Sequence, residues 1–331
     1  MRHQTRSLVA LAAMIASTLA VTGCGGGSSS GNAAGMLNLG ITDAPVDDAQ
    51  QVVVVFTGVE LHRRDGQSVQ MDFGGANKSI DLMLLQNGAT ADLLQGASVP
   101  AGEYNWMRLE VLADRNAQGE SYILLDSGQQ YPLWITSGAE TGLKLVRPFT
   151  VAQGSVTRLL VDFDLRKSVT APPGQDPNYV LRPALRLLDH LQVGAIDGVV
   201  DLAALTSQEL GAGVPVDDCK AGVYLFNGAA AAPDDQDGNA ADGADPVVYQ
   251  SVEYDGLNTA VGYRIPFVEV GSYTLAATCN LDVDASPTDS EFDPTAVSGQ
   301  PGYQTMNWSV VQDVAVTVDQ TTTVDLPAAG P

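Results

Sequence analysis

An acidic loop in the second half of the chain carries the side chains best suited to holding a metal ion. Asp234, Asp235 and Asp237 supply carboxylate oxygens within one short stretch, and oxygen ligands of this kind suit calcium. An EF-hand loop requires acidic or amide ligands at positions one, three and five before a glycine at position six. Counting back from Gly238 gives Asp237 and Asp235 but then Pro233, so the loop departs from that pattern. Two interpretations stay open, an irregular calcium site and a solvated acidic loop.

Two further acidic segments have the chemistry to bind cations. The first lies between residues 282 and 293, and its carboxylates would add ligands if this loop meets the Asp234 loop. The second is a turn around Pro45 that holds three aspartates, Asp43, Asp47 and Asp48. Aspartate side chains accept local backbone hydrogen bonds, so turn formation is the simpler role for these three, and cation binding is the alternative.

Two of the three cysteines indicate a disulfide. Cys219 and Cys279 form an even pair once Cys24 is assigned another role, and an exported protein meets oxidising conditions. A bridge between them closes a loop of about 60 residues and should stabilise the fold by about 4 kcal/mol. Two isolated cysteines lack the paired spacing of a zinc site. The alternative is a pair of buried free thiols.

The start of the chain reads as an export signal that ends at Cys24. A basic start is followed by an apolar stretch, Ser7–Val21, of the length of a secretory signal. Val21-Thr22-Gly23-Cys24 resembles the lipobox of bacterial lipoproteins, in which the cysteine is diacylated and becomes the first residue after cleavage. The resemblance implies that residues 1–23 are a signal peptide and that Cys24 contacts the membrane through its lipid. The alternatives are an ordinary cleaved signal and an uncleaved helix, although a spanning helix needs roughly 20 apolar residues.

The residues that follow the cysteine predict a flexible connection. Residues 24–35 are dominated by Gly, Ser and Ala, which have no side chains able to build a core, so we expect a tether there. Gly25, and not an aspartate, follows Cys24. By the lipoprotein resemblance this favours the outer membrane, with the protein facing either the periplasm or the outside.

Charge is spread unevenly along the chain, whose formal net charge is −23. Residues 25–190 hold 12 Lys/Arg and 18 Asp/Glu, whereas residues 191–331 hold 2 and 21, so the two parts carry −6 and −19. Such a chain is repelled by phosphate backbones, which excludes nucleic acid as a partner. The partners that fit this charge are cations or a basic protein surface, and the alternative is that the charge only keeps an exported protein soluble. The expected partner is an unknown envelope protein or glycan.

Catalytic motifs do not occur in the sequence. It contains no H-E-x-x-H and no G-x-S-x-G elbow, in which the serine sits on a turn from a strand into a helix, and only His62 and His190 remain after the signal peptide. His62 reads as a strand end that enters an exposed turn, and His190 as part of the link between two domains. We therefore expect no enzyme activity, the alternative being an envelope hydrolase whose triad is assembled from distant residues.

The first half of the chain reads as strands separated by turns. Met107, Leu109 and Val111 alternate with charged residues, which is the period of a half-buried sheet. Only Ile80–Leu94 fits one or two short helices better. The expected strands are Leu37–Ile41, Gln51–Leu61, Met107–Val111, Ser121–Leu125, Gln130–Ile135, Leu143–Val151, Leu159–Leu165 and Val180–Leu188.

Alternation also predicts the surroundings of two acidic residues in one of these strands. Asp162 and Asp164 lie on the opposite side of the strand from Phe163. We expect them to be exposed and to form ion pairs with Arg158 and Arg166, which would stabilise the fold by about 0–1 kcal/mol each.

The second half predicts a β-sandwich, because seven short strands are separated by turn signals. Together the two halves predict an all-β protein with two β-sandwich-like domains, residues 36–190 and residues 193–331, after the signal peptide and tether. The expected strands of the second half are Ala195–Asp201, Ala221–Phe226, Val247–Tyr254, Ala260–Phe267, Gly271–Cys279, Ser309–Val318 and Thr321–Leu326.

Several segments between residues 36 and 190 resemble one bacterial family. Leu39–Asp48, Pro100–Trp106 and Val161–Val169, among others in the same order, look like the domain of unknown function 4382. That resemblance implies an exported, often lipid-anchored protein without an assigned activity. The acidic half more weakly resembles carboxypeptidase-regulatory-like and prealbumin-like sandwich modules, at Gly194–Val200 and Val270–Ala277 among others, which implies a binding or spacer module and no protease.

The sequence therefore predicts a lipid-anchored envelope protein that acts as a non-catalytic binding, structural or adhesion module, with calcium dependence as its most specific version. The tryptophans Trp106, Trp134 and Trp308 have the chemistry of a carbohydrate platform. Because they are scattered over separate strands, packing at sheet surfaces is the favoured interpretation.

Overall fold

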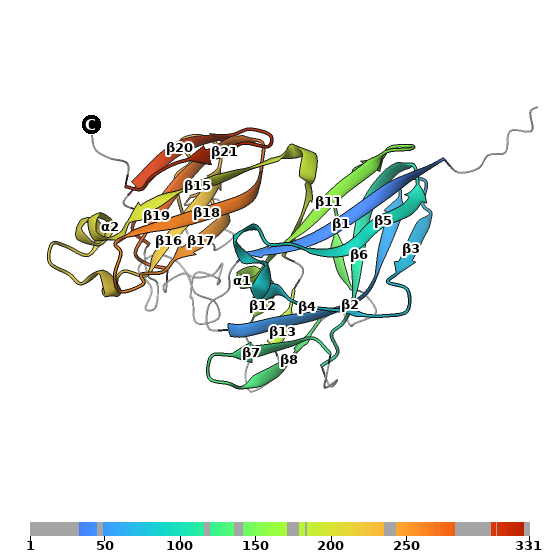
Figure 1. Ribbon diagram of the computed structural model, residues 1–331, viewed down its shortest axis with the longest axis horizontal. Helices are drawn as coiled ribbons and strands as arrows, with labels where there is room; N and C mark the ends of the chain where they lie inside the picture. The colour runs from blue at the N-terminus through green and yellow to red at the C-terminus, as the bar shows by residue number, and fades with distance from the viewer. Residues whose placement is uncertain are drawn as a thin grey trace, which may run out of the picture. The chain divides into compact units, whose positions relative to one another are not determined.

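Strands dominate the chain, and the expected all-β fold is confirmed (Figure 1). The structure is a computed structural model that describes residues 33–44, 49–115, 120–135, 142–170, 179–182, 184–234, 243–281, 306–308 and 310–327. Ala33–Pro331 form one compact unit, within which the domain boundary near residue 193 stays a prediction. In the part of the chain that the structure describes, no helix has the length and apolar character to span a bilayer.

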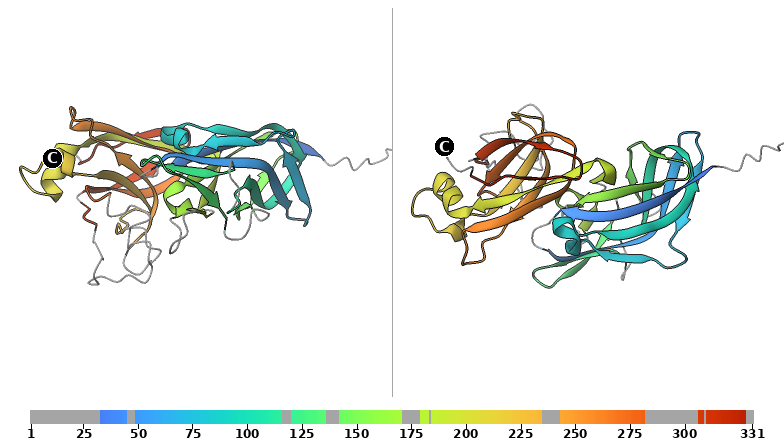
Figure 2. Two further views of the ribbon diagram at one scale, coloured as in Figure 1. Left: turned by 90° about the horizontal axis from the view of Figure 1, so that it is seen from below. Right: turned by 45° about the horizontal axis from the view of Figure 1, so that its top comes forward.

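A four-stranded sheet opens the fold. β1 lies between β11, with which it pairs in parallel, and β5, with which it pairs in antiparallel fashion (Figures 1 and 2). β1 begins at Ala34, two residues before the expected start of the domain. The strands, in their order across the sheet, are β14 (Leu185–Asp189), β11 (Val156–Asp164), β1 (Ala34–Ala44) and β5 (Ala91–Pro100).

A larger sheet packs against the first. Its longest strand is β2 (Ala49–Arg63), along whose sides four other strands pair. The main path is β10 (Phe149–Val151), β6 (Gly102–Leu112), β2, β7 (Tyr122–Leu125), β8 (Gln130–Trp134), β13 (Tyr179–Leu181) and β12 (Val169–Thr170). The side branches are β3 (Ser68–Asp72) and β4 (Lys78–Asp81) on β2, and β9 (Leu143–Leu145) on β6, while α1 (Leu165–Ser168) joins β11 to β12.

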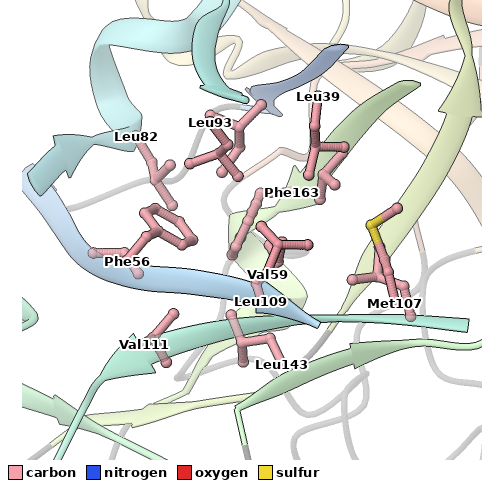
Figure 3. Close-up of a cluster of buried hydrophobic side chains, with 14 of the residues drawn as sticks. Leu39, Phe56, Val59, Leu82, Leu93, Met107, Leu109, Val111, Leu143 and Phe163 are labelled. Carbon is pink, nitrogen blue, oxygen red and sulfur yellow. The ribbon is translucent and has the colours of Figure 1, made fainter. Parts of the chain in front are cut away.

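The core of this part lies between the two sheets. Phe56 of β2 and Phe163 of β11 meet edge to face with ring centroids 6.3 Å apart. Figure 3 shows these rings among inward-pointing residues such as Leu39, Leu93 and Met107. Burying a side chain of this size contributes about 1.5–3 kcal/mol to stability. The apolar residues of the alternating strands therefore make the main stabilising contacts.

The helices predicted for Ile80–Leu94 are only partly present. A short 3-10 helix, η1 (Leu82–Gly88), begins where the carboxylate of Asp81 accepts a hydrogen bond from the Met83 amide. The flanking residues form β4 and β5 instead. Leu93 and Leu94 are both buried, although they are adjacent in β5, and a strand covered on both faces has no alternation to report it.

The second part of the chain, from Val193 onward, contains all seven of the strands predicted for it. Two sheets face each other across a core that includes Ile196, Val223 and Leu275. One has the order β18 (Ala260–Glu269), β15 (Val193–Asp201) and β21 (Thr321–Thr323). The other has the order β17 (Pro246–Val252), β16 (Ala221–Asn227), β19 (Gly271–Thr278) and β20 (Val310–Val316). Three short helices, which the sequence pattern did not indicate, are η3 (His190–Gln192), α2 (Leu202–Glu209) and η4 (Val216–Asp218).

The predicted disulfide is present. Cys219 and Cys279, separated by 60 residues, are joined with their Cα atoms 4.6 Å apart. The backbone amide of Cys279 also donates a hydrogen bond to a carboxylate oxygen of Glu209 at 2.6 Å. The bridge and this hydrogen bond together attach β19 to α2 and to the segment that precedes β16.

The expectation for Asp162 was wrong. Its side chain is buried, not exposed, and accepts hydrogen bonds from Arg186, the residue opposite it on β14. The residues from Leu159 to Phe163 are all buried, because other elements cover both faces of β11. In this strand a polar residue in the alternating pattern, Asp162, belongs to a buried ion pair and does not face solvent.

Candidate functional site

The residues predicted to bind calcium lie mostly outside the described residues. Of Asp234, Asp235 and Asp237, only Asp234 is described. Asp47, Asp48 and the acidic segment from residue 282 to residue 293 also lie outside the described residues. Among the residues that the structure does describe, no three His, Cys, Asp or Glu side chains lie close enough to hold a metal ion. Cys24 is also outside the described residues, so both the calcium site and the lipid anchor stay predictions.

A group of aromatic and cationic side chains, which we call the Trp106 face, lies on the outer side of the larger sheet. It consists of His62 from β2, Trp106 and Arg108 from β6, and Lys144 from β9. These four come from three neighbouring strands of one sheet, in the order β2, β6, β9.

Strand alternation and register bring these residues together. Leu61, Met107 and Leu109 point into the core. Their neighbours along the strands, His62, Trp106 and Arg108, therefore point outward. His62 lies directly opposite Trp106, and Arg108 lies opposite Lys144. Cross-strand neighbours on one face have Cβ atoms about 4.5–5.5 Å apart, which is close enough for side chains of this size to touch.

The indole of Trp106 is the centre of the face. The ring of His62 stacks on it with an interplanar angle of 8° and a centroid separation of 4.5 Å. The Lys144 amine lies 4.2 Å from the centroid of the indole ring, and the guanidinium carbon of Arg108 lies 5.1 Å from it. Contacts between a cation and an aromatic ring at such distances are worth about 0.5–1 kcal/mol at an exposed site.

The two cations differ in how they are held. Arg108 donates a hydrogen bond to Glu60 at 2.9 Å, while its Nε is buried without a hydrogen-bond partner among the described residues. Lys144 is exposed and forms no ion pair in the described part of the chain. The lysine amine is therefore the positive charge of the face that can turn toward a ligand.

A fixed tyrosine lies near one end of β6, in the core and not on the Trp106 face. Burial raises the pKa of Tyr104, whose hydroxyl donates a hydrogen bond to the carbonyl of Pro100 at 2.6 Å. The guanidinium of Arg63 lies 5.8 Å from the ring centroid of Tyr104 and pairs with Asp65. This tyrosine stays neutral and serves as structural support for the adjoining strand ends.

His62 also forms the pair that a hydrolase would need first. Its Nδ1 lies 3.1 Å from Oγ of Ser68, the residue opposite it on β3. A triad further requires a carboxylate that orients the histidine, and in the described part of the chain the other ring nitrogen has no hydrogen-bond partner. The second predicted histidine, His190, lies in η3, between β14 and β15, where a link was expected.

Sequence reasoning identified Trp106 and His62 but did not bring them together. Their pairing depends on the register of β2 against β6, which shifts at two irregular positions. The available signal was a tryptophan followed two residues later by an arginine, on the outward side of an alternating strand. That signal places both side chains on one face but does not identify the strand beside it.

Comparison with known families matches the first part of the chain. Residues 34–183 match the family described as "Domain of unknown function (DUF4382)", in agreement with the resemblance seen in the sequence. Among curated proteins, none matches the chain.

Solved structures resemble the chain only remotely. A leucine-rich repeat protein from Bacteroides thetaiotaomicron VPI-5482 is 11% identical with a TM-score of 0.22, over 89% of this chain and 26% of that one, so the chain spans about a quarter of its length. GBS52, the minor pilin of Streptococcus agalactiae, is 11% identical with a TM-score of 0.17, over 87% and 94%. Mfa2, the fimbrial anchor protein of Porphyromonas gingivalis, is 10% identical with a TM-score of 0.18, over 75% and 79%. TM-scores this low carry no weight for the fold or function of this chain.

The family match covers one region of the fold. The matched residues contain the four-stranded sheet apart from β14 and the whole of the larger sheet, including the strands of the Trp106 face. The similarity to the DUF4382 family therefore covers the strands that form these two sheets, apart from β14, and the Trp106 face.

Proposed function

We propose that this protein is a non-catalytic binding module of the cell envelope, anchored by lipid at Cys24, whose Trp106 face binds an acidic glycan. The observation that carries the proposal is the stack of His62, Trp106 and Lys144 on an outer sheet surface. An indole packs against the apolar face of a sugar ring, and an ammonium group pairs with a sugar carboxylate.

The state of Lys144 supports this ligand class. The Lys144 amine lies over the indole ring, where it is exposed and without an ion pair in the described chain. Turning the flexible side chain outward would uncover one face of Trp106 and present a positive charge beside it. Arg108, held by Glu60, would stay in place as a second donor at the edge of the same ring.

The surroundings of His62 support a binding role over a catalytic one. Stacking on Trp106 occupies the face of the imidazole, and its only hydrogen bond in the described chain is to Ser68. A hydrolase would also need hydrogen-bond donors for a developing oxyanion. Inside a sheet the backbone amides bond the neighbouring strands, so they do not serve as such donors. The disulfide between Cys219 and Cys279 fits an oxidising compartment, which supports export.

Binding to charged and uncharged polysaccharides tests the proposal. The mature chain should be retarded by polygalacturonate in affinity electrophoresis and not by dextran. Trp106→Ala should weaken binding about tenfold, equivalent to about 1.4 kcal/mol. Lys144→Glu should do the same, whereas Lys220→Glu, the same charge change at an exposed lysine of the second part, should leave retardation unchanged.

Two results would contradict the proposal. Equal effects of Lys144→Glu and Lys220→Glu would show that only net charge matters. Retardation by dextran as strong as that by polygalacturonate would remove the role of the sugar carboxylate. A Ser68→Ala variant that loses a measurable hydrolase activity would instead support the catalytic alternative.

Calcium binding by the second part is a further candidate function, because the stems of both acidic loops reach one aromatic cluster. Tyr224 and Phe226 of β16 pack edge to face against Trp308, which follows the second acidic segment. The same cluster includes Ala231 and Ala244, one on each side of the first acidic loop. Leu281, just before the second segment, and Met306, after it, also belong to the cluster. This convergence supports a shared cation site, since carboxylates from both loops would then repel one another unless a cation were bound.

Thermal unfolding of the whole mature chain tests the calcium proposal. Calcium at millimolar concentration should raise the melting temperature of the second part, because a ligand that binds only the folded form stabilises it. Sodium at matched ionic strength should not reproduce the shift. Replacing Asp235 and Asp237 by Asn should diminish it, and identical melting curves in calcium, magnesium and chelator would leave only a solvated acidic loop.

A further inference from the structure

An open hollow of about 330 Å³ lies where the end of η1 meets the second part of the chain. Its floor is formed by β15 and by the turn between β20 and β21, and Pro266 and Phe267 of β18 form one wall. Asn87 and Gly88, at the end of η1, line the opposite side, and a Cβ added at Gly88 would lie 3.2 Å from Pro266. A volume of this size is at the lower end of the range for small-molecule sites in proteins.

Backbone strain is concentrated around this hollow. Four non-glycine residues of the described chain have a positive φ, and three of them line it: Asn87 at 58°, Phe267 at 53° and Asp319 at 53°. A left-handed conformation is tolerable for asparagine and aspartate but is a clear outlier for phenylalanine. Residues held in such conformations cluster at ligand sites, where the surrounding structure keeps them in place.

The cause of the strain at Phe267 is a bulge in β18. Gly194 pairs with Val268 and Ile196 pairs with Ile265, so two residues, Pro266 and Phe267, oppose one residue of β15. A bulge of this kind redirects a side chain away from the regular alternation. Here it brings the Phe267 ring against His190, with centroids 6.0 Å apart, at the border of the hollow.

The polar side chains around the hollow have unused hydrogen-bonding capacity. Asn87, Gln320 and Thr321 are exposed, and their side chains form no hydrogen bond within the described residues. Their amide and hydroxyl groups both donate and accept. These groups can therefore satisfy a ligand that carries several hydroxyls.

The formal charges around the hollow cancel. Arg264 contributes a positive charge and Asp319 a negative one, and the Arg264 guanidinium already lies 3.5 Å from Asp197. Both charged groups remain available as hydrogen-bonding groups. A ligand without net charge fits such a lining better than an anion or a cation does.

We propose that this hollow is a binding site for one neutral sugar residue. Phe267 and Pro266 offer apolar surface to the C–H face of the sugar ring, while Asn87, Gln320 and Thr321 bond its hydroxyls. A neighbouring hollow of about 540 Å³ shares Asn87 and Arg264 with the first. This second hollow leaves room for a further sugar residue of the same oligosaccharide. This site uses none of the residues of the Trp106 face and does not depend on the function proposed for that face.

Saturation-transfer NMR on the mature chain tests the proposal, because it detects millimolar binding. The probes are D-glucose, D-galactose, N-acetyl-D-glucosamine and, as a zwitterionic comparison, L-alanine. Transfer to at least one sugar and none to alanine is the expected result. Gln320→Ala should reduce the transfer at least severalfold, and Gln208→Ala, at an exposed glutamine of α2, should leave it unchanged.

An Asn87→Gly variant separates binding from folding. Glycine adopts the left-handed conformation of this residue without strain, so the turn is retained while the amide group is lost. We expect a melting temperature no lower than that of the parent together with reduced transfer to the sugar. No transfer to any of the three sugars, transfer to alanine alone, or unchanged transfer in both the Asn87→Gly and Gln320→Ala variants would overturn the proposal.

Discussion

The guanidinium of Arg186 on β14 hydrogen-bonds the carboxylate of Asp162, its cross-strand neighbour on β11. The Asp162 side chain is 10% exposed, whereas that of Arg186 is 31% exposed, so only the carboxylate is largely removed from water. Asp162→Ala would leave the guanidinium half-buried without this partner. We expect the free energy of unfolding to fall by about 1.5–3 kcal/mol, measured by chemical denaturation.

A nearby surface residue provides the control for this prediction. Arg158 lies on the same strand but is exposed, so Arg158→Ala should change stability by less than about 0.5 kcal/mol. Equal losses for Asp162→Ala and Arg158→Ala would show that the buried pair has no special role.

Loss of the disulfide should destabilise the second part. Replacing both Cys219 and Cys279 by Ser opens a loop of 60 residues. The free energy of unfolding should fall by about 4 kcal/mol, since the unfolded chain regains the conformational freedom that the bridge removed. Denaturation of the variant and the parent measures the loss, and peptide mapping without reduction should recover the linked peptides only from the parent.

Alkaline pH should weaken the fold partly through Tyr263. Burial, with smaller contributions from Asp325 and Asp197, raises the pKa of this tyrosine above its ordinary value of 10.0. The unfolded chain therefore loses this proton at lower pH than the folded chain, so the stability that Tyr263 contributes is present below pH 10 and falls as pH rises further.

A Tyr263→Phe variant tests this pH dependence. Near neutral pH the variant loses the hydrogen bond from the hydroxyl to the Val324 carbonyl at 2.7 Å, and it should be less stable by about 1–3 kcal/mol. Above pH 10 the parent weakens faster than the variant, so the difference in unfolding free energy should narrow. A difference that stays constant across the titration would contradict the assignment.

Replacement of the predicted lipid-bearing cysteine should release the protein from the membrane. Cys24→Ala removes the thiol that would be acylated, and the apolar stretch before it is shorter than a spanning helix. We expect no incorporation of a fatty-acid analogue and recovery of the variant in the soluble fraction. Equal labelling of the variant and the parent would exclude lipidation at this residue.

Most strands were predictable because one face of each is buried and the other is not. Met107, Leu109 and Val111 show this alternation plainly. The helix α2 was not expected, although it carries a local signal, since Asp201 caps it by accepting a hydrogen bond from the Ala204 amide. Its eight residues bury only Leu202, Leu205 and Thr206, too few to establish a helical period.

Contacts between strands were not predictable in the same way. The stack of His62 on Trp106 requires β2 and β6 to pair in one register, and that register is shifted where the strands are irregular. The sequence shows which side of its own strand a residue faces, but not which residue of the next strand lies beside it. The same limit explains why Arg186 was not recognised as the partner of Asp162.

The position of β1 has a mechanical consequence for a tethered protein. The strand begins almost where the proposed tether ends, and it lies between β11 and β5, bonded to both along its length. Tension applied at the start of the strand and in line with it would load β1 along its own axis. The hydrogen bonds to both neighbours would then be loaded together in shear, and not broken one after another as in a strand peeled from a sheet edge. A first strand bonded on both sides therefore resists being drawn out of the sheet better than an edge strand would.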